Sequence, residues 1–447
     1  MKKIIKTIRN IWSIEDLRKR ILYTIGLIFV YRIGSFISLP GLDPVKLTMQ
    51  QSSQGLMGLL DMFAGGSFSR ASIFALGIMP YISASIAMQL LTIVVPSYQK
   101  LQKEGESGQR KITQHTRYLT VLVTGAQAIA YVSYLKSQSA QAILPEFQGI
   151  TFWLTTVIVL TSGSLFVMWL GEKITDKGIG NGTSLLIEIG IIASLPGALV
   201  YEWQSKANMG GGGLLIFLLE IAFLIAVIAG LVALVQGTRK IPVNYAKRGI
   251  GAKQVGGARQ FLPLKVNAAG VMPIIFAQSI MFIPMAFASL ATPGGTMAGI
   301  IQALSDFTSV PYNIVYALMV ILFTYFYTAL IFNPTQMADQ MKRNNGFIPG
   351  IKPGKATANY IGTIMDRIML PGSVLLAIVG ILPGFSSAIN INQQFAIFFG
   401  GTSMLIIVAV VLDTLQQIEG HLLMRHYDGL MSKGRVSGRN ATTGAAI

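Results

Sequence analysis

The sequence predicts an all-α integral membrane protein, and three observations support this prediction. The 447 residues are 52% hydrophobic and only 12% charged, and their mean hydropathy is +0.59. These values are typical of chains embedded in a bilayer. Ten segments are long and apolar, and the basic residues gather in alternate connections between them. We therefore expect a polytopic bundle of ten transmembrane helices.

The ten segments approach the length of about 20 mostly apolar residues that a transmembrane helix needs. An even number of spans places both termini on the same side of the membrane. The predicted spans lie at 21–39, 71–95, 116–135, 150–170, 182–200, 213–236, 267–291, 311–332, 369–388 and 393–412.

The Lys and Arg residues orient this bundle. Thirty of the 35 lie in the two tails or in the loops 96–117, 171–181, 237–266 and 333–368. The opposite face carries four, and Arg32 lies inside the first predicted span. Because basic loops remain on the cytoplasmic side, both termini are predicted to be cytoplasmic. Part of the net charge of +17 is then the ordinary topological signal, with attraction to anionic lipid.

The two ends of the chain lie outside the predicted spans. Residues 1–20 place Ile4, Ile8 and Trp12 at helical spacing among basic residues. This pattern is typical of an amphipathic helix on a membrane surface, and the segment is too charged for a cleaved signal peptide. Residues 413–447 are predicted to form a cytoplasmic tail. The chain has no cysteine, which excludes disulfides and thiol catalysis.

A short motif occurs twice in the chain. GIMP begins at Gly77 and GVMP begins at Gly270, and each opens a long apolar segment. Isoleucine follows each proline by two positions, at Ile82 and Ile275. An internal repeat predicts two related halves, and paired interrupted segments in membrane proteins indicate a site on the axis between the repeats. Chance similarity between two apolar segments is the alternative.

Two cytoplasmic loops are longer than the topology requires. Residues 237–266 contain seven basic and no acidic residues, and residues 333–368 contain five basic residues among several turns. Long basic loops bind phosphate-rich RNA or an acidic protein surface, although a plain solvated loop explains the composition equally well. The first loop also predicts a hairpin that involves Val243, Tyr245, Phe261 and Leu262.

Motifs for catalysis are missing from the sequence. It contains no GxxxxGK[ST] phosphate loop, no HExxH metal site and no GxSxG nucleophile turn, so no ATPase activity of its own is predicted. Ionisable residues inside spans are costly, and here they are Arg32, Glu188 and Glu220. Arg32 and Glu220 are interpreted as structural, and Glu188 as a buried hydrogen-bonded group in preference to a proton relay. This scarcity argues against an ion-coupled transporter.

The segment 55–70 is a further irregular feature. It is apolar, but Asp61 and then Gly65 and Gly66 interrupt it. So short a run cannot cross about 30 Å of hydrocarbon. It is predicted either to re-enter the membrane while held inside protein or to lie as a loop at the outer surface.

Ten stretches of the sequence resemble, in order, those of the SecY family of protein-conducting channels. None is decisive alone, but the ordered series is specific and extends from residue 31 to about residue 415. The stretches are YRIGSF at 31–36, MFAGG at 62–66, SRASIFALGIMPYIS at 69–83, KEGESG at 103–108, MWLGE at 168–172, GIGNG at 178–182, NYAKR at 244–248, LPLKVN at 262–267, FNP at 332–334 and FGGTS at 399–403.

The resemblance implies an hourglass of ten helices in two inverted, pseudo-symmetric halves, here 21–200 and 201–412. A short plug helix at about 59–70 is then expected to block the outer funnel, with plug residues Met62, Phe63, Ala64, Gly65 and Gly66. An aliphatic pore ring is expected at the constriction, because apolar rings resist wetting and ion flow. The ring positions are Ile78, Ile82, Ile187, Ile275 and Ile406, with Thr183 at a sixth position that is commonly aliphatic in the family.

The resemblance also implies a lateral gate between the spans 71–95 and 267–291, through which apolar segments reach lipid. Polar contacts between spans are worth about 0.6–2 kcal/mol each, so an apolar signal sequence can compete with them. The expected gate residues are Ser83, Ser85, Gln89, Gln278 and Ser279, with Gln127 on the third span as a weaker candidate.

The function that follows from the resemblance is a passive channel for unfolded secretory polypeptides and signal sequences in the bacterial plasma membrane, with no cofactor. The implied partners are the SecE and SecG subunits, the SecA motor that hydrolyses ATP, and the ribosome. The last two are expected to dock on the basic loops through Arg239, Lys240, Lys247, Arg248 and Lys352. Lys352 departs from the arginine usual in the family and lacks its planar fork of donors.

Two other classes of function remain as alternatives. A secondary transporter with inverted repeats would carry a substrate site of charged or unwound residues at the midplane, whereas a channel would have an aliphatic waist. An intramembrane enzyme is the weaker alternative, because no pairing of a nucleophile with a base and no set of metal ligands is evident.

Overall fold

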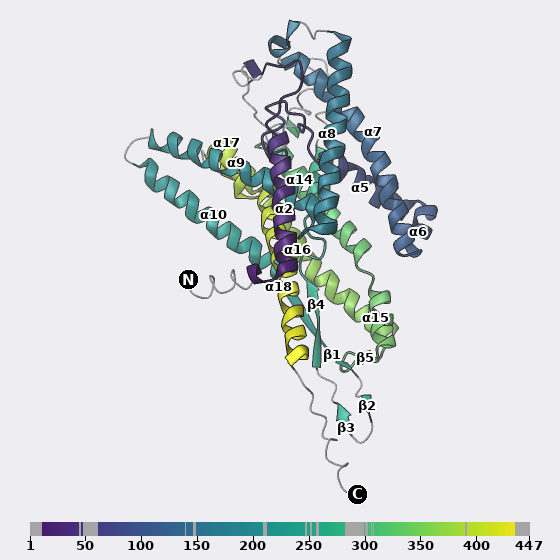
Figure 1. Cartoon of the computed structure of the whole chain (residues 1–447). Coiled ribbons are helices and arrows are strands. Elements are labelled where there is room, and N and C mark those ends of the chain that lie inside the picture. Colours follow the sequence, from purple (N-terminus) through teal and green to yellow (C-terminus); the bar gives the residue numbers. More distant parts are fainter. Residues whose placement is uncertain are drawn as a thin grey trace.

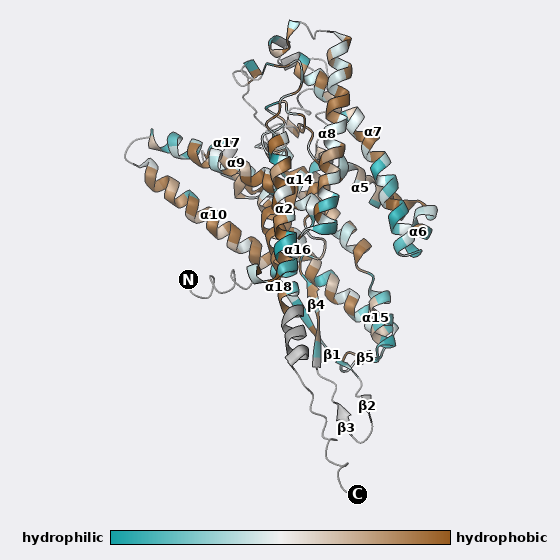
Figure 2. Ribbon diagram, viewed as in Figure 1, coloured by the Kyte–Doolittle hydropathy of each residue, from teal (hydrophilic) through white to brown (hydrophobic). Residues whose placement is uncertain are grey.

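The chain is described here by a computed structural model, and it forms an elongated helical bundle with a small sheet at one end (Figure 1). Apolar residues cover most of the long helices, whereas polar residues gather around α6 and α15 (Figure 2). The structure describes residues 11–43, 46–47, 61–138, 140–145, 149–208, 212–245, 248–250, 253–255, 259–281, 299, 303–304, 306, 308–388 and 391–433.

The first half of the chain consists mainly of α-helices. α2 (Glu15–Gly34) comes first, and a series of turns at 64–78 leads into α5 (Met79–Val94). α5 meets α6 (Pro96–Lys103) at 97°, because Pro96 cannot continue the hydrogen bonding of the preceding helix. The later elements of this half are α7 (Glu106–Gln138), the 3-10 turn η1 (Ala140–Ala142), α8 (Ile150–Lys177) and α9 (Gly182–Ala207).

The second half begins with α10 (Gly213–Gln236), and its helices are interrupted by strands. The strands are β1 (Thr238–Tyr245), β2 (Arg248–Ile250), β3 (Lys253–Val255), β4 (Arg259–Lys265) and the short β5 (Gly346–Phe347). The helices are α11 (Met272–Met281), α14 (Val310–Ile331), α15 (Pro334–Arg343), α16 (Lys355–Ala388), α17 (Gln393–Ala396), the 3-10 turn η4 (Ile397–Phe399) and α18 (Gly401–Lys433).

Seven helices of the described residues are long and apolar enough to cross a membrane, or eight if the bent pair α5 and α6 is one span. The seven include the predicted spans 3 to 6 and 8 to 10. The other three predicted spans fall on α2, whose first turns are charged, on the 16-residue α5, and on α11, of which ten residues are described. Two helices begin later than predicted. The span predicted to begin at residue 71 has its helix from Met79, and the span predicted to begin at residue 393 has its long helix from Gly401.

The two copies of the repeated motif adopt the same local structure. Gly77 has φ +54° and Gly270 has φ +66°, and in each copy the helix begins at the methionine two positions later. Glycine is suited to both positions, because left-handed backbone is costly for residues with a Cβ. The packing order also recurs: α5 packs on α7, α7 on α8 and α8 on α9, as α11 packs on α14, α14 on α16 and α16 on α18. The repeat in the sequence therefore reflects a repeat in the fold.

The two long basic loops, predicted to be cytoplasmic, come together in one sheet of order β4-β1-β5. β1 pairs antiparallel with β4, with Ile241 opposite Leu262 and Pro242 opposite Phe261, which confirms the predicted hairpin. β5 belongs to the second loop and pairs with Asn244 and Tyr245 at the end of β1. A separate apolar core joins the sheet to α15 and α16, and its buried residues are Ile241, Val243, Leu264, Met341, Ile348 and Ile361.

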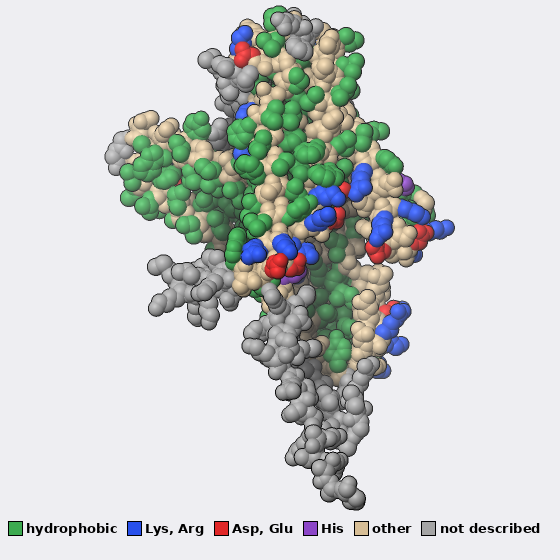
Figure 3. Space-filling view, viewed as in Figure 1, with side chains coloured by type: hydrophobic (Ala, Val, Ile, Leu, Met, Phe, Trp, Pro, Cys, Tyr) green, Lys and Arg blue, Asp and Glu red, His purple; other side chains and the backbone are tan. Residues whose placement is uncertain are grey.

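The surface divides into an apolar belt and a charged end. Hydrophobic side chains cover the middle of the molecule and the α9–α10 hairpin that projects from its side (Figure 3). On α10 the exposed side chains include Leu215, Leu218 and Ile225. Lys and Arg gather below this belt on the same face. Apolar residues exposed on this scale require lipid around them.

Candidate functional site

Helices from both halves meet the segment 61–70 at one small cavity. Its lining residues are Phe63, Met79, Ile82, Ile187, Ile275, Gln278 and Ile406. The four isoleucines come from four different helices, α5, α9, α11 and α18. The cavity has a volume of about 10 Å³, which is the space of about one water molecule. The space between these side chains is therefore closed in this conformation, and nearly all of its lining is apolar.

The other two predicted ring residues, Ile78 and Thr183, do not line this cavity and lie instead near Gly171. A Cβ built on Gly171 of α8 would lie 3.4 Å from Cδ1 of Ile78 and 3.2 Å from Cγ2 of Thr183. The Thr183 hydroxyl donates to Oδ1 of Asn181 at 2.7 Å, so it is held at the first turn of α9. Thr183 thus presents its methyl group to α8. Met79 lines the cavity although it was not predicted, and its place in the repeated motif was the available signal.

The predicted plug residues lie beside this cavity. Met62, Phe63 and Ala64 are buried, and Phe63 reaches the cavity itself. The backbone of this segment presses on α9 at Gly190, where an added Cβ would lie 2.7 Å from the Phe63 carbonyl oxygen. Only glycine at this position permits so close an approach. Gly65 and Gly66 have φ +65° and +79° and form the turn that ends the plug helix.

Asp61 organises the turn after the plug. Its Oδ1 accepts from the backbone N–H of Ser69 at 2.8 Å, and its backbone oxygen accepts from the N–H of Gly66 at 2.8 Å. Burial raises the pKa of the Asp61 carboxyl, and the hydrogen bonds from Ser69 and the charge of Arg70 oppose that rise. The Asp61 side chain therefore holds the segment as a compact loop.

The predicted gate residues are distributed over three helices. Ser83, Ser85 and Gln89 are half-buried on α5, and Gln127 is half-buried on α7. Gln89 accepts at 3.4 Å from the Tyr327 hydroxyl of α14, a contact that was not predicted because it joins residues far apart in the chain. The remaining two candidates lie on α11: Gln278 is buried, and the side chain of Ser279 lies outside the described residues.

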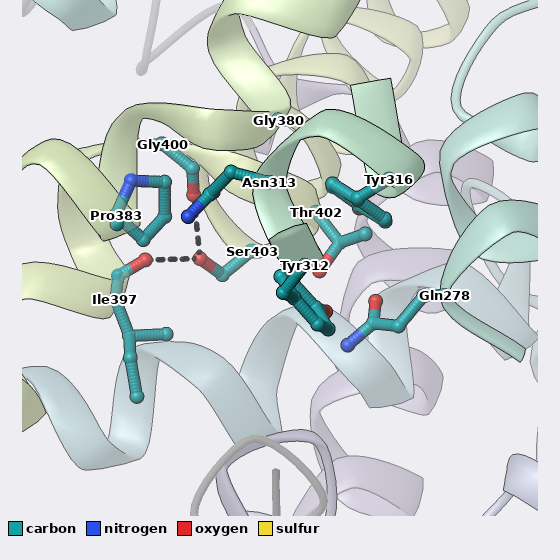
Figure 4. A pocket seen from close by; sticks show the side chains of 12 residues that line it. Gln278, Tyr312, Asn313, Tyr316, Gly380, Pro383, Ile397, Gly400, Thr402 and Ser403 are labelled. Carbon is teal, nitrogen blue, oxygen red and sulfur yellow. Dashed lines mark hydrogen bonds between the residues drawn. The ribbon is translucent and has the colours of Figure 1, made fainter. Parts of the chain in front are cut away.

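Gln278 lines a second cavity behind the ring. This cavity, of about 30 Å³, lies between α11, α14, α16 and the start of α18. Figure 4 shows the Gln278 side chain beside Tyr312, with Asn313, Thr402 and Ser403 farther along the wall. The Ser403 hydroxyl donates to the backbone oxygens of Ile397 and Gly400. Gln278 therefore borders both cavities, and the wall of the second one carries a few polar groups among mostly apolar ones.

The predicted docking residues lie at the sheet end. Arg239 and Lys240 are exposed on β1, and Lys352 is exposed on the second loop between two glycines in left-handed conformation, Gly350 and Gly354. The shared sheet therefore brings the two basic loops to the same end of the molecule. The two other candidates are less fully described: Lys247 and the side chain of Arg248 lie outside the described residues.

Glu220, which lies inside the sixth predicted span, forms a salt bridge. Lys206 Nζ lies 3.4 Å from Oε1 of Glu202 and 3.1 Å from Oε1 of Glu220, and all three residues are buried. The backbone N–H of Asn392 donates to Glu202 Oε2 at 3.0 Å. These partners were not predicted, because Glu202 and Lys206 lie beyond the predicted end of the fifth span.

Glu188 is buried immediately after Ile187. Among the described residues no group of His, Asp and Glu is arranged to hold a metal ion.

Comparison with known proteins agrees with this geometry. The SecY family model matches residues 72–415. The protein translocase subunit SecY of Streptomyces scabiei is 46% identical over 433 residues, which cover 93% of this chain and 97% of that protein. The protein translocase subunit SecY of Chlamydia muridarum is 40% identical over 455 residues, which cover 97% of this chain and 99% of that protein.

Solved structures share the fold at much lower identity. One, described as the structure of a protein conducting channel, matches with a TM-score of 0.66 at 18% identity and covers 93% of this chain and 94% of its own. Another, Sec61 in the canine ribosome-channel complex from the endoplasmic reticulum, matches with a TM-score of 0.64 at 17% identity over the same shares. From the family match and the two bacterial relatives, the chain belongs to the SecY family of protein translocase subunits.

Proposed function

We propose that this chain forms the channel through which unfolded polypeptides cross the bacterial plasma membrane, with both termini in the cytoplasm. The observation that carries the proposal is the waist cavity, where Ile82, Ile187, Ile275 and Ile406 surround a space of about 10 Å³ beneath Phe63. An aliphatic ring excludes ions by dewetting and packs around any passing side chain by dispersion. It therefore forms a seal without selecting particular sequences.

The plug and the gate are the moving parts in this proposal. Residues 61–70 close the outer side of the ring at rest and leave it when a chain enters. α5 and α11 separate to release apolar segments into lipid, and the 3.4 Å contact between Gln89 and Tyr327 is one of the weak polar links that hold the α5 side. Contacts of this kind are worth about 0.6–2 kcal/mol each, within the reach of a competing signal sequence.

Energy comes from partners in this proposal. The sequence has no phosphate-binding loop, so the SecA motor or the translating ribosome drives transport, and SecE and SecG complete the complex. The basic platform with Arg239, Lys240 and Lys352 is the docking surface for the motor and the ribosome. One structural relative is described as part of a ribosome-channel complex, and the same docking is proposed here. Lys352 provides charge at this surface without the bidentate fork of arginine.

Reconstituted vesicles test the proposal. The chain with SecE and SecG is placed in proteoliposomes, SecA and ATP are added, and a radiolabelled preprotein is followed into protease protection. Transport that requires both the chain and ATP supports the proposal. If no preprotein is protected but a small solute accumulates against a gradient, the chain is a transporter, and the channel proposal is wrong.

A further inference from the structure

Two arginines converge on one carbonyl oxygen of the plug. Arg32 Nη1 donates to the Gly65 oxygen at 3.3 Å, and Arg70 Nη2 donates to the same oxygen at 2.8 Å. Both guanidinium groups also lie over the ring of Phe36, with Cζ 5.4 Å from the ring centroid for Arg32 and 4.4 Å for Arg70. Charged donors and cation–π contacts are among the stronger polar interactions in proteins. We call Arg32, Phe36, Gly65 and Arg70 the clasp.

The two arginines differ in where they are anchored. Arg70 belongs to the same loop as Gly65, so its hydrogen bond moves with the plug. Arg32 lies in the last turn of α2, which is a separate element. The Arg32 bond therefore ties the plug to the first span, and it must break when the plug leaves the ring.

Gly65 and Gly66 leave space for the two guanidinium groups of the clasp. A Cβ at Gly65 would lie 2.8 Å from Nη1 of Arg32, and a Cβ at Gly66 would lie 2.9 Å from Nη2 of Arg70. Neither position accepts a side chain unless an arginine moves away. The Gly65-Gly66 pair thus provides the turn and also the room for two guanidinium groups.

A fixed attachment lies beside this reversible one. The backbone N–H of Leu39 donates to the Ala71 oxygen, and the N–H of Ile73 donates to the Ile37 oxygen, both at 2.9 Å. These bonds join the chain after α2 to the base of the plug segment. The Tyr131 hydroxyl of α7 donates to the Phe68 oxygen at 2.7 Å and adds a contact near the same base. The plug can therefore turn about residues 71–73 while the clasp holds its other end.

We propose that the clasp is the latch that keeps the plug seated, with Arg32 as the positioning residue that decides between closed and open. The inference rests on the proposed function, because it assigns the gating of that channel to particular side chains. Arg70 Nε is buried with no hydrogen-bond partner among the described residues. This nitrogen adds nothing to the hold on the plug, so the two bonds to the Gly65 oxygen and the two contacts with the Phe36 ring form the latch.

Resting conductance and plug position test the latch together. The chain with SecE and SecG is placed in planar bilayers without preprotein, and ion conductance is recorded for Arg32→Gln, Phe36→Leu and Tyr131→Phe. Phe36 is 62% exposed, so its substitution leaves the core intact. In a second set, Phe63→Cys and Ile187→Cys are added to each variant, and the rate of disulfide formation reports how often the plug is seated.

The latch predicts a graded response. Resting conductance rises about tenfold for Arg32→Gln, which loses a charged hydrogen bond and a ring contact, and about threefold for Phe36→Leu, which loses only the ring contact. Disulfide formation slows in the same order. Tyr131→Phe stays close to the unsubstituted protein in both measurements, because its contact lies beside the fixed end.

Two results would overturn or separate the proposals. If Arg32→Gln and Phe36→Leu elute and unfold like the unsubstituted protein and leave conductance and disulfide rate unchanged, the latch is wrong. If Arg32→Gln does not fold, Phe36→Leu decides alone. If the unsubstituted complex moves no preprotein and Arg32→Gln still raises conductance, the channel function fails while the latch stands as the gate of another pore.

Discussion

The two copies of the repeated motif begin equivalent helices, but the segments that precede them differ. Before α5 stands the buried plug segment with its turn at Gly65 and Gly66, whereas before α11 stands β4 of the basic sheet. Both helices then bring an isoleucine, Ile82 or Ile275, to the same cavity. The repeat thus builds the shared cavity, and the segment before each helix differs between the halves. In the proposed function, one of these segments is the outer seal and the other is the cytoplasmic docking platform.

The largest expected effect comes from the platform. Arg239→Glu with Lys240→Glu places acidic groups where basic ones stand, and juxtaposed like charges cost several kcal/mol. Binding of ribosomes or SecA to the reconstituted complex is expected to weaken by about 100-fold and to depend less steeply on salt, because two basic groups are lost. Lys46→Glu, on the predicted outer face, is the control and should leave binding unchanged. Equal losses for both variants would mean that docking does not depend on the sheet.

The shared waist is expected to give the next largest effect. Ile275→Asn introduces an amide into the ring and favours water there, so resting ion conductance should rise about tenfold, the equivalent of about 1.4 kcal/mol of barrier. Ile275→Leu keeps an apolar group of the same size and should conduct like the unsubstituted channel. The comparison of the halves predicts that Ile82→Asn behaves like Ile275→Asn. A leak from only one of the two would show that the repeats do not contribute equally.

The seat of the plug gives a smaller effect that belongs to one half alone. Gly190→Ala places a Cβ 2.7 Å from the Phe63 oxygen, and crowding of this kind costs about 1–3 kcal/mol, so the plug should shift and the resting leak increase severalfold. Gly197→Ala, on the same helix with open space around it, should be neutral or stabilise the helix by about 0.5–1 kcal/mol. Identical behaviour of the two variants in conductance and in thermal unfolding would refute close seating of the plug on α9.

The smallest expected effect tests the repeat itself. Gly77→Ala and Gly270→Ala each force a Cβ into left-handed backbone, at a cost of about 1–2 kcal/mol. Neither site has a neighbouring atom closer than 3.8 Å, so strain rather than collision decides the outcome. Thermal unfolding in detergent should show similar decreases for both. A decrease for one only would break the structural equivalence of the two motifs.

Patterns along the chain were enough to predict most of the helices and the hairpin. Apolar length located the spans, and alternation around Val243 and Phe261 predicted the pairing of β1 with β4, because both signals are local. The ring isoleucines required the family resemblance, since a single isoleucine within a span carries no mark of its role. The structure brings four of the six predicted ring positions to one cavity and leaves Ile78 and Thr183 beside Gly171.

Contacts between distant parts of the chain were not predictable from such patterns. β5 is two residues long, too short for any alternation, yet it joins the two basic loops. The triad of Glu202, Lys206 and Glu220 depends on how α9 and α10 pack at their outer ends. The bond from Arg32 to Gly65 likewise joins residues 33 positions apart. Each depends on tertiary packing, on which a single sequence carries little information.

We propose that a polypeptide passes through the cavity ringed by Ile82, Ile187, Ile275 and Ile406. The chain has no cysteine of its own, so Ile82→Cys creates a single reactive position at the waist, and Leu218→Cys on the exposed face of α10 is its control. A secretory preprotein with one midway cysteine is stalled during SecA-driven transport, and the mixed disulfide is measured. We expect a disulfide at Ile82→Cys that requires ATP, and none at Leu218→Cys. Efficient transport without any disulfide at Ile82→Cys would contradict it, because the chain would then cross the membrane by another path.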